Sequence, residues 1–172
     1  LSFRPNVVFP RHRAIAADWL KVCGITASPQ NINLTNGATA AMTVALMSVA
    51  PPGSSVATEA IGHHTLVPLA SYLGFNLHGL PIDGDGIVPD ALDEACRVSD
   101  IRAVFVQPSV INPTATLMSE TRRAALVEVA RKHDIAIIES DVLGPLVSDH
   151  PAPIACMAPE RTLYLTSFTK IT

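Results

Sequence analysis

The sequence has few charged residues: Asp, Glu, Lys and Arg make up 16% of its 172 residues, against roughly 25% in a typical soluble domain. The net charge of −3 and the pI near 6.0 argue against nucleic-acid binding by these residues, because such binding depends on clustered Lys and Arg. Three isolated cysteines, Cys23, Cys96 and Cys156, fit reduced thiols in a cytoplasmic protein better than a disulfide framework or a zinc site.

Long apolar runs are also missing. The most apolar segments, residues 38–50 and 66–80, are interrupted by polar residues, Pro or Gly well short of the roughly 18 to 20 residues that span a bilayer. The chain opens on Leu1, without a basic region, an apolar core and a cleavage site in order. We therefore expect neither a transmembrane helix nor a signal peptide. The apolar fraction of 48% indicates that part of the surface meets a partner.

Helical and strand-like patterns alternate along a chain long enough for one domain. Strands separated by helices of this length indicate βαβ units. The predicted fold class is therefore α/β, in three α/β/α layers around a mostly parallel sheet. The Asp-Gly-Asp-Gly cluster at residues 83–86 is expected to turn. The expected helices cover residues 11–22, 38–49, 65–73, 89–98 and 119–133, and the expected strands residues 31–34, 55–58, 76–80, 102–106, 135–138 and 163–165.

Four segments that follow predicted strands are candidates for a site, because ligands of open α/β sheets bind beyond the carboxyl ends of the strands. These segments are residues 35–40, 107–114, 139–141 and 166–170. Taken singly, each motif has an ordinary explanation: a turn at Asn36-Gly37, a loop dipeptide at Asn112-Pro113, a helix cap at Asp141 and a surface lysine at Lys170. Their joint order along the chain favours chemistry.

Together these motifs resemble pyridoxal-phosphate-dependent proteins of the aspartate-aminotransferase fold (fold type I), over nearly the whole chain. The stretch TLYLTSFTK, residues 162–170, ends in the family's Ser-x-Ser/Thr-Lys motif. The resemblance implies that Lys170 is the catalytic Schiff-base lysine, which acts as leaving group and as base. It also implies that Asp141 is the catalytic carboxylate that keeps the pyridine nitrogen protonated, so that the ring accepts electrons.

The resemblance assigns further cofactor-binding residues. Gly37, Ala38 and Thr39 match the glycine turn at a helix start that binds the cofactor phosphate, where amide groups and the helix dipole favour an anion. Ser167 and Thr169 offer hydroxyl groups to the same phosphate.

The asparagine of the family's Asn-Pro-Thr motif hydrogen-bonds the phenolic oxygen of the cofactor. Asn112 takes that position in the motif at residues 112–114, although the glycine that usually follows is Ala115.

A narrower resemblance is to the aminotransferase-like domain of MocR-type regulators in the GntR class, which carry an N-terminal winged helix-turn-helix. It rests on HRAIAADWL at residues 12–20, ATLMSETRRAALVEVARKHDIAIIESD at 115–141 and PAPIACMAPERTLYLTS at 151–167. Two positions depart from that subgroup. Leu143 replaces a tyrosine that donates to the phenolic oxygen, and His63 or His64 replaces an aromatic residue against the cofactor ring. Stacking by His63 and a His pair that is merely exposed to solvent both remain open.

The resemblance implies that residues 1–172 are the cofactor-binding large domain of a longer chain, with the small domain and any DNA-binding domain outside it. It further implies a cytoplasmic homodimer, a small-molecule amino compound as partner, contact with DNA only through a domain outside this chain, and no membrane association. No metal site is expected.

Three functions remain under consideration. The favoured one is an effector-sensing module of a transcription regulator. The second is the large domain of a free class I/II aminotransferase acting on an amino acid. The third, a Rossmann-type nucleotide-binding module, is disfavoured because no Gly-x-Gly-x-x-Gly follows a first strand. The cluster at residues 83–86 also lacks the spacing of a calcium loop.

Overall fold

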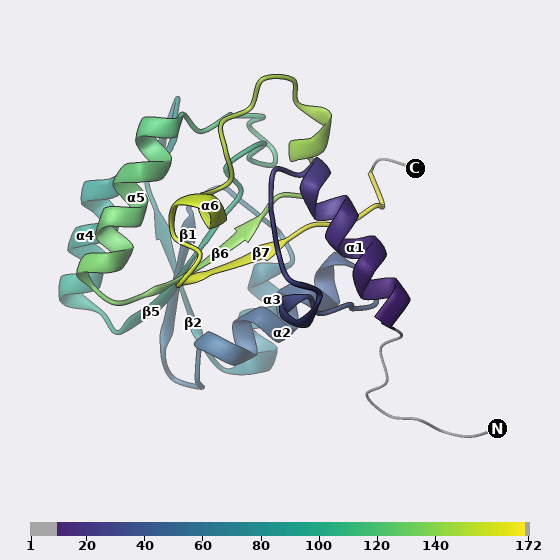
Figure 1. Cartoon of the computed structure of the whole chain (residues 1–172). Coiled ribbons are helices and arrows are strands. Elements are labelled where there is room, and N and C mark those ends of the chain that lie inside the picture. The colour runs from purple at the N-terminus through teal and green to yellow at the C-terminus, as the bar shows by residue number, and fades with distance from the viewer. Residues whose placement is uncertain (1–9, 171–172) are drawn as a thin grey trace.

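The structure is a computed structural model that describes residues 10–170, and its centre is a five-stranded sheet (Figure 1). All neighbouring strands run parallel, in the order β2-β1-β5-β6-β7. The predicted α/β class with a mostly parallel sheet is therefore confirmed. The strands are β1 (Ser55–Glu59), β2 (Asn76–Leu80), β5 (Ile101–Val106), β6 (Ala136–Ser140) and β7 (Thr162–Leu165).

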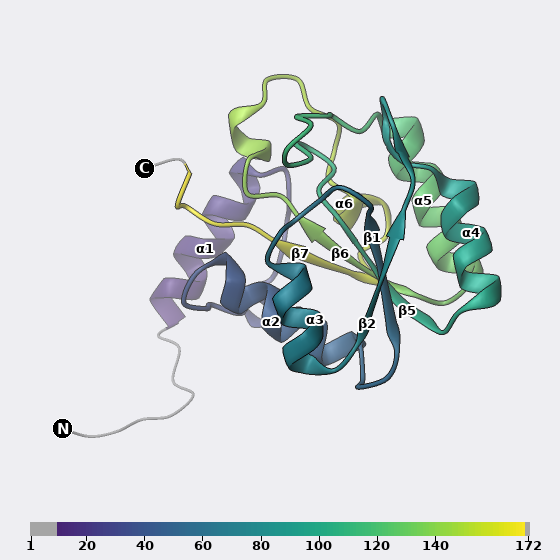
Figure 2. The ribbon, with the colours of Figure 1, turned by 180° about the vertical axis from the view of Figure 1, so that it is seen from behind.

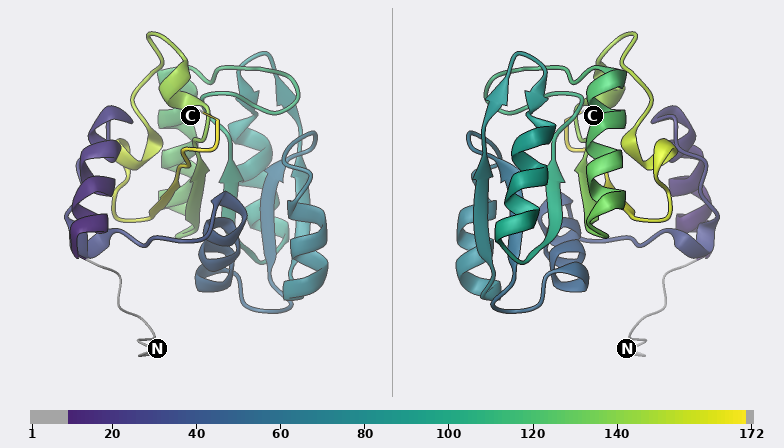
Figure 3. Two further views of the ribbon diagram at one scale, coloured as in Figure 1. Left: turned by 90° about the vertical axis from the view of Figure 1, so that its right-hand side faces the viewer. Right: turned by 90° about the vertical axis from the view of Figure 1, so that its left-hand side faces the viewer.

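Helices cover both faces of the sheet, which gives three layers: Figure 1 shows the sheet nearly edge-on, and the two views of Figure 3 look onto its opposite faces. Figures 1 and 2 show that α2 and α3 lie side by side on one face, that α4, α5 and α6 lie on the other, and that α1 lies beyond β7. None of these helices within residues 10–170 has the length and apolar character needed to cross a membrane. The helices are α1 (Pro10–Val22), α2 (Ala38–Val49), α3 (Leu66–Leu73), α4 (Pro89–Val98), α5 (Glu120–Lys132) and α6 (Ile154–Met157).

Two apolar clusters hold the layers together, one on each face. Because successive strand residues point to opposite faces, Val104 packs with α4 and α5, whereas Phe105 packs with α2 and α3. Leu126 of α5 and Leu46 of α2 are among the fully buried members of the two clusters. This burial on both faces explains why the strands read as continuous apolar runs in the sequence.

Most expected elements form close to their predicted bounds, and α2 forms at residues 38–49 as predicted. Ser119 caps α5, as expected for a helix start, because its hydroxyl accepts the Arg122 N–H at 3.2 Å. The predicted strand at residues 31–34 is wrong: a 3-10 helix covers Pro29–Asn31, and the residues after it form no ladder with any described strand. An extended segment becomes a strand only when a neighbour takes its hydrogen bonds.

Short elements that the pattern did not predict lie in the connections. The expected turn at residues 83–86 is confirmed as the tip of a small antiparallel hairpin, β3 (Ile82–Asp83) and β4 (Gly86–Ile87). Asp85 ties this hairpin to α5, since its carboxylate accepts the Ser119 N–H and hydroxyl, each at 2.6 Å. A 3-10 helix at Gly144–Leu146 and the one-turn α6 complete the fold.

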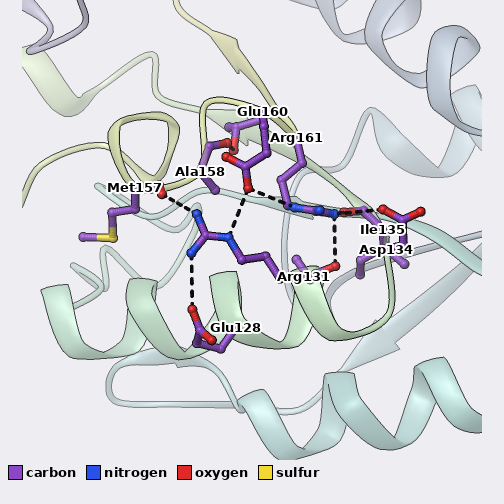
Figure 4. Close-up of polar contacts among 10 residues, drawn as sticks. Glu128, Arg131, Asp134, Ile135, Met157, Ala158, Glu160 and Arg161 are labelled. Carbon is purple, nitrogen blue, oxygen red and sulfur yellow. Dashed lines mark hydrogen bonds and ion pairs between the residues drawn. The ribbon is translucent and has the colours of Figure 1, made fainter.

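Charged side chains form a paired network at the amino ends of β6 and β7 (Figure 4). Arg131 of α5 and Arg161 before β7 both donate to Glu160 Oε1, at 3.1 and 3.3 Å. Arg161 Nη1 also donates to the carbonyl of Ile135 at 3.1 Å and to Asp134 Oδ1 at 3.4 Å. The charged groups at this end of the sheet are therefore paired with one another.

Candidate functional site

A cavity of about 150 Å³ lies beyond the carboxyl ends of the strands, where parallel topology predicts a site. Segments that follow β1, β5, β6 and β7 line it together with the start of α2. Of the nine predicted site residues, Gly37, Thr39 and Ser167 are outside the lining, each next or close in sequence to a residue that belongs to it. The other six line the cavity: Ala38, His63, Asn112, Asp141, Thr169 and Lys170.

The start of α2 and the segment after β7 both offer hydrogen-bond donors. Gly37 precedes α2 with a φ of 87°, a left-handed conformation that glycine adopts without strain. The first amide groups of the helix have no intrahelical partners and favour an anion. After β7, the hydroxyl oxygens of Ser167 and Thr169 lie 3.1 Å apart, and Ser167 Oγ accepts the Thr169 N–H at 3.3 Å.

Asp141 follows β6 and is held on two sides. Its backbone N–H donates to the Leu165 carbonyl at 2.8 Å, and its carboxylate oxygen Oδ2 accepts the hydroxyl of Tyr164 at 2.8 Å. The side chain is 1% exposed. The other oxygen, Oδ1, is buried and has no hydrogen-bond partner within residues 10–170. An unpaired carboxylate oxygen at a cavity wall is a ready acceptor for a cationic N–H.

His63 presents a neutral aromatic ring. Its Nδ1 accepts the Thr65 N–H at 3.3 Å, which places the proton of the neutral ring on Nε2. Burial lowers the pKa of His63, and the neighbouring His64 lowers it further. The ring stacks on His64 at 5.2 Å and meets the edge of Phe105 at 6.1 Å. Of the two open alternatives for His63, the structure places the side chain in the cavity lining rather than free in solvent.

Two buried charged residues anchor the loop at 107–118, which carries Asn112. Glu59 Oε1 accepts the Gln107 N–H at 2.8 Å, and burial raises the pKa of this carboxyl. On the other side, Arg123 of α5 is fully buried and donates to the Pro108 carbonyl at 3.2 Å. The loop is therefore positioned by groups that do not line the cavity themselves.

The loop has an unusual backbone around Asn112. The Asn112–Pro113 peptide bond is cis, and Ala115 has a φ of 55°. A left-handed conformation favours glycine. Ala115, which replaces the glycine usual in the family, thus has a backbone conformation that favours glycine.

Leu143 lines the cavity with an aliphatic side chain. Leu143, which stands where the MocR-type subgroup has a tyrosine, therefore changes the chemistry of the cavity lining, because a phenol at this position would also belong to it. Val142 and Ser140 line the same wall.

Sequence reasoning missed three residues of the site. Tyr164 was part of the quoted TLYLTSFTK stretch but received no role. Gln107 lines the cavity, and its Nε2 is buried without a partner in the described part of the chain. Gly144 lies so close to Asp141 that a Cβ there would come within 2.1 Å of Oδ1. The available signal for Tyr164 was strand alternation, which places it on the same face of the sheet as Asp141.

The chemistry of these residues fits pyridoxal phosphate. The cavity lining contains a primary amine, on Lys170, and a buried carboxylate oxygen of Asp141 that has no partner in the described residues. It adds the amide of Asn112 and the start of α2, where a phosphate group is favoured.

Comparison with known proteins gives the same family. Residues 3–171 match the class I and II aminotransferases. The chain is 30% identical over 151 residues to the uncharacterised HTH-type transcriptional regulator YjiR of Escherichia coli, covering 86% of this chain and 32% of YjiR. It is 30% identical over 164 residues to the HTH-type pyridoxine biosynthesis transcriptional regulator PdxR of Corynebacterium glutamicum, covering 94% of this chain and 35% of PdxR. The chain spans about a third of the length of these relatives.

Solved structures agree with the sequence matches. An archaeal alanine:glyoxylate aminotransferase superposes with a TM-score of 0.89 at 27% identity, over 99% of this chain and 44% of that one. The N-succinyldiaminopimelate aminotransferase of Mycobacterium tuberculosis superposes with a TM-score of 0.77 at 29% identity, over 92% of this chain and 43% of that one. The predicted resemblance is confirmed, and the chain belongs to the family of class I and II aminotransferases.

Proposed function

We propose that this chain is the pyridoxal-phosphate-binding, effector-sensing module of a MocR-type regulator of the GntR class. The observation that carries the proposal is that Lys170, Asp141 and Asn112 line one cavity. Two relatives support the proposal by their names. PdxR of Corynebacterium glutamicum is named as a regulator of pyridoxine biosynthesis, and PtsJ of Salmonella typhimurium as a repressor of the vitamin B6 salvage pathway.

Each lining residue has a task toward the cofactor. When bound, pyridoxal phosphate supplies a carbonyl carbon that reacts with primary amines and a ring that withdraws electrons from the bond being broken. Lys170 would provide the amine that attaches it. Asp141 Oδ1 would accept the N–H of the ring nitrogen, and Asn112 would donate to the phenolic oxygen. The ring of His63 would cover the cofactor ring.

The phosphate end rests on neutral donors. The turn at Gly37 would present the amide groups of Ala38 and Thr39 at the start of α2 to the phosphate, and the hydroxyls of Ser167 and Thr169 in the segment after β7 would donate to it. The adjacency of the two hydroxyls, 3.1 Å apart, supports a shared anion.

The parent protein is proposed to be longer than this chain, in line with the third of each regulator that the chain covers. Its DNA-binding domain and the small domain would lie outside residues 1–172. A small-molecule amino compound reaching Lys170 would change the affinity of the attached domain for DNA. The proposed location is the cytoplasm, which the three isolated cysteines support.

Borohydride reduction tests the cofactor site, because it fixes pyridoxal phosphate to the amine that holds it. The chain has three lysines, Lys21, Lys132 and Lys170. In the full-length protein, peptide mapping should find the label on Lys170 and not on the other two. Lys170→Ala should abolish the label, whereas Lys132→Ala, the matched control on α5, should keep it. A label on Lys21 or Lys132 would contradict the assignment.

A free aminotransferase acting on an amino acid is the second candidate. The chain is 30% identical over 169 residues to a probable N-succinyldiaminopimelate aminotransferase, DapC of Mycobacterium tuberculosis. A DNA mobility-shift assay on the full-length protein separates the two functions. Binding to DNA that responds to an amino compound and requires Lys170 supports the regulator. Steady conversion of an amino acid to its keto acid without DNA binding supports the enzyme.

A homodimer through α2 and α3 is the proposed assembly. The two helices contain no charged residue, and they leave Val44, Met47, Val67 and Tyr72 exposed. An apolar surface of this kind is typical of a buried interface. Met47→Glu should shift the full-length protein toward monomer in analytical ultracentrifugation. Val98→Glu, on exposed α4 across the sheet, should not, and a dimer that survives Met47→Glu would place the interface elsewhere.

A further inference from the structure

Tyr164 reaches the carboxylate of Asp141 from the neighbouring strand. It lies on β7 in register with Glu139 of β6, so its side chain leaves the sheet on the same face as Glu139 and, two residues later, Asp141. The Tyr164 hydroxyl donates to Asp141 Oδ2 at 2.8 Å. Asp141 Oδ1 has no hydrogen-bond partner in the described part of the chain.

The carboxylate of Asp141 has little room to turn. On one side the backbone of Gly144 packs so closely that a Cβ would lie 2.1 Å from Oδ1. On the other side lies the half-buried Tyr164, whose hydroxyl donates to Oδ2. The two carboxylate oxygens therefore have different surroundings: Oδ2 has a fixed donor, and Oδ1 has none.

We propose that Tyr164 is a positioning residue for Asp141. By holding Oδ2, its phenol leaves Oδ1 as the one carboxylate oxygen available to the N–H of a protonated pyridine nitrogen. The inference rests on the function proposed above, because it takes Asp141 as the partner of that nitrogen.

The chemistry of the phenol suits this task. Burial raises the pKa of Tyr164 above its ordinary value, and the negative charge of Asp141 raises it further, with Cys23 and Glu139 acting in the same direction. The hydroxyl therefore keeps its proton at neutral pH. A phenol has a single O–H, so it serves one carboxylate oxygen and cannot occupy both. A phenylalanine would fill the same space and leave Oδ2 buried without a donor.

Two ligands compared in the full-length protein test the proposal. They are pyridoxal phosphate and its 1-deaza analogue, in which a C–H replaces the ring nitrogen. In Tyr164→Phe, the dissociation constant of pyridoxal phosphate from equilibrium dialysis should rise roughly tenfold, as losing the partner of a binding group commonly costs. The constant for the deaza analogue should not change. Thr121→Val, which removes an exposed hydroxyl on α5 across the sheet from the proposed dimer surface, is the control and should leave both constants unchanged.

A measurement without ligand tests the hydrogen bond directly. In the ligand-free protein with labelled tyrosine ring carbons, the NMR signal that disappears in Tyr164→Phe belongs to Tyr164. Asp141→Asn should change the chemical shift of that signal at neutral pH, because the phenol then no longer donates to a charged carboxylate. A signal with the same chemical shift in both proteins would overturn the pairing.

The outcomes separate this inference from the proposed function. Equal losses for both ligands in Tyr164→Phe would assign Tyr164 to general packing of the cavity, and unchanged affinity for both would show that Oδ1 needs no help; either result overturns the proposal. If the wild-type protein binds neither ligand, the proposed function fails, and the role of Tyr164 toward the ring nitrogen fails with it. The NMR comparison of the wild-type and Asp141→Asn proteins would then still report on the Tyr164–Asp141 pair.

Discussion

The two ends of the central sheet differ in how their polar groups are satisfied. At the amino ends of β6 and β7, a hollow of about 380 Å³ is lined by charged residues that all have partners: Asp134, Glu160 and Arg161 (Figure 4). At the carboxyl ends, the cavity of about 150 Å³ has buried atoms in or next to its wall that find no partner within residues 10–170: Gln107 Nε2, Ser109 Oγ and Asp141 Oδ1.

Unpaired polar atoms therefore distinguish the proposed cofactor end better than size does, because the larger hollow is the one whose charged residues all have partners. A buried polar atom without a partner costs about 1–3 kcal/mol, and such atoms are rare in folded chains. They persist where a ligand completes them. Two further unpaired atoms in the described residues, Arg13 Nε and Trp19 Nε1, are on α1. Trp19 packs at 4.8 Å against Phe168, in the segment that ends at Lys170.

Removing a group that is both buried and paired should have the largest effect on stability. Arg123 is fully buried and donates to the carbonyls of Pro108, Met118, Pro151 and Ala152. Arg123→Met leaves these carbonyls without their donor and should lower the free energy of unfolding by about 3–5 kcal/mol, measured in urea.

The matched control for Arg123 is on the same helix. Arg131 of α5 is also paired, but its side chain is 42% exposed, so water replaces its partners when it is removed. Arg131→Met should therefore cost far less than Arg123→Met. Equal losses would mean that pairing alone, without burial, decides stability at both ends.

A carboxylate next to the site should make stability depend on pH. Glu139 is fully buried and accepts the N–H groups of Ile154 and Ala155, each at 2.8 Å. Burial raises its pKa from 4.5 to about 7, and the charge of Asp141 contributes in the same direction. Because the folded protein holds this proton more tightly than the unfolded chain does, stability should fall as pH rises from about 4.5 to about 7, by at most about 3 kcal/mol.

Substitutions identify the group that makes stability depend on pH. Glu139→Gln should remove the fall in the free energy of unfolding between about pH 4.5 and pH 7, as measured by urea unfolding of the ligand-free protein at a series of pH values. Glu160→Gln, in the paired network at the amino end, should keep it, because Arg131 lowers the pKa of Glu160 instead of raising it. A slope that persists in Glu139→Gln would point to another titrating group.

Two isosteric substitutions compare Asp141, whose Oδ1 is unpaired in the described residues, with Asp134, which is paired with Arg161. Asp141→Asn should weaken pyridoxal phosphate binding by roughly 10- to 100-fold, the value of a charge-assisted hydrogen bond. It should leave the ligand-free protein as stable as before or more stable, because it removes a buried charge of which one oxygen, Oδ1, has no partner in the described part of the chain. Asp134→Asn, at an exposed position in the opposite network, should leave the affinity unchanged. A destabilised ligand-free Asp141→Asn protein would show that this carboxylate serves the fold.

Local patterns predicted the helices and the site's position well. The bounds of α2 and the Ser119 cap follow from apolar runs and capping chemistry, which short stretches of sequence carry. The order of motifs after successive strands placed Asp141, Asn112 and Lys170 in one cavity, because parallel strands end on one edge.

What the sequence did not predict depends on contacts between distant segments. The expected strand at residues 31–34 failed because pairing with a neighbour is not written in the residues themselves. Tyr164 was missed for a related reason: its partner lies 23 residues away, and only the register of β6 against β7 brings them together. Nothing in the sequence marks Gly144, because only the folded loop brings its backbone against the carboxylate of Asp141.

The smallest effect concerns backbone conformation, where the two ends again differ. Both have a non-glycine residue with positive φ: Asp134 at the amino end, with 53°, and Ala115 in the cavity loop, with 55°. Aspartate tolerates this region better than alanine does, and alanine pays about 1–2 kcal/mol there. Glycine removes that strain but increases the conformational freedom of the unfolded chain, by about 0.4–1 kcal/mol. Ala115→Gly should therefore raise the free energy of unfolding by up to about 1 kcal/mol.

Ala14→Gly, at an exposed position inside α1, should instead lower the free energy of unfolding by about 1 kcal/mol. Urea unfolding of both variants under one set of conditions measures the opposite signs, and a loss of stability in both would mean that the loop at Ala115 does not keep its left-handed turn in solution.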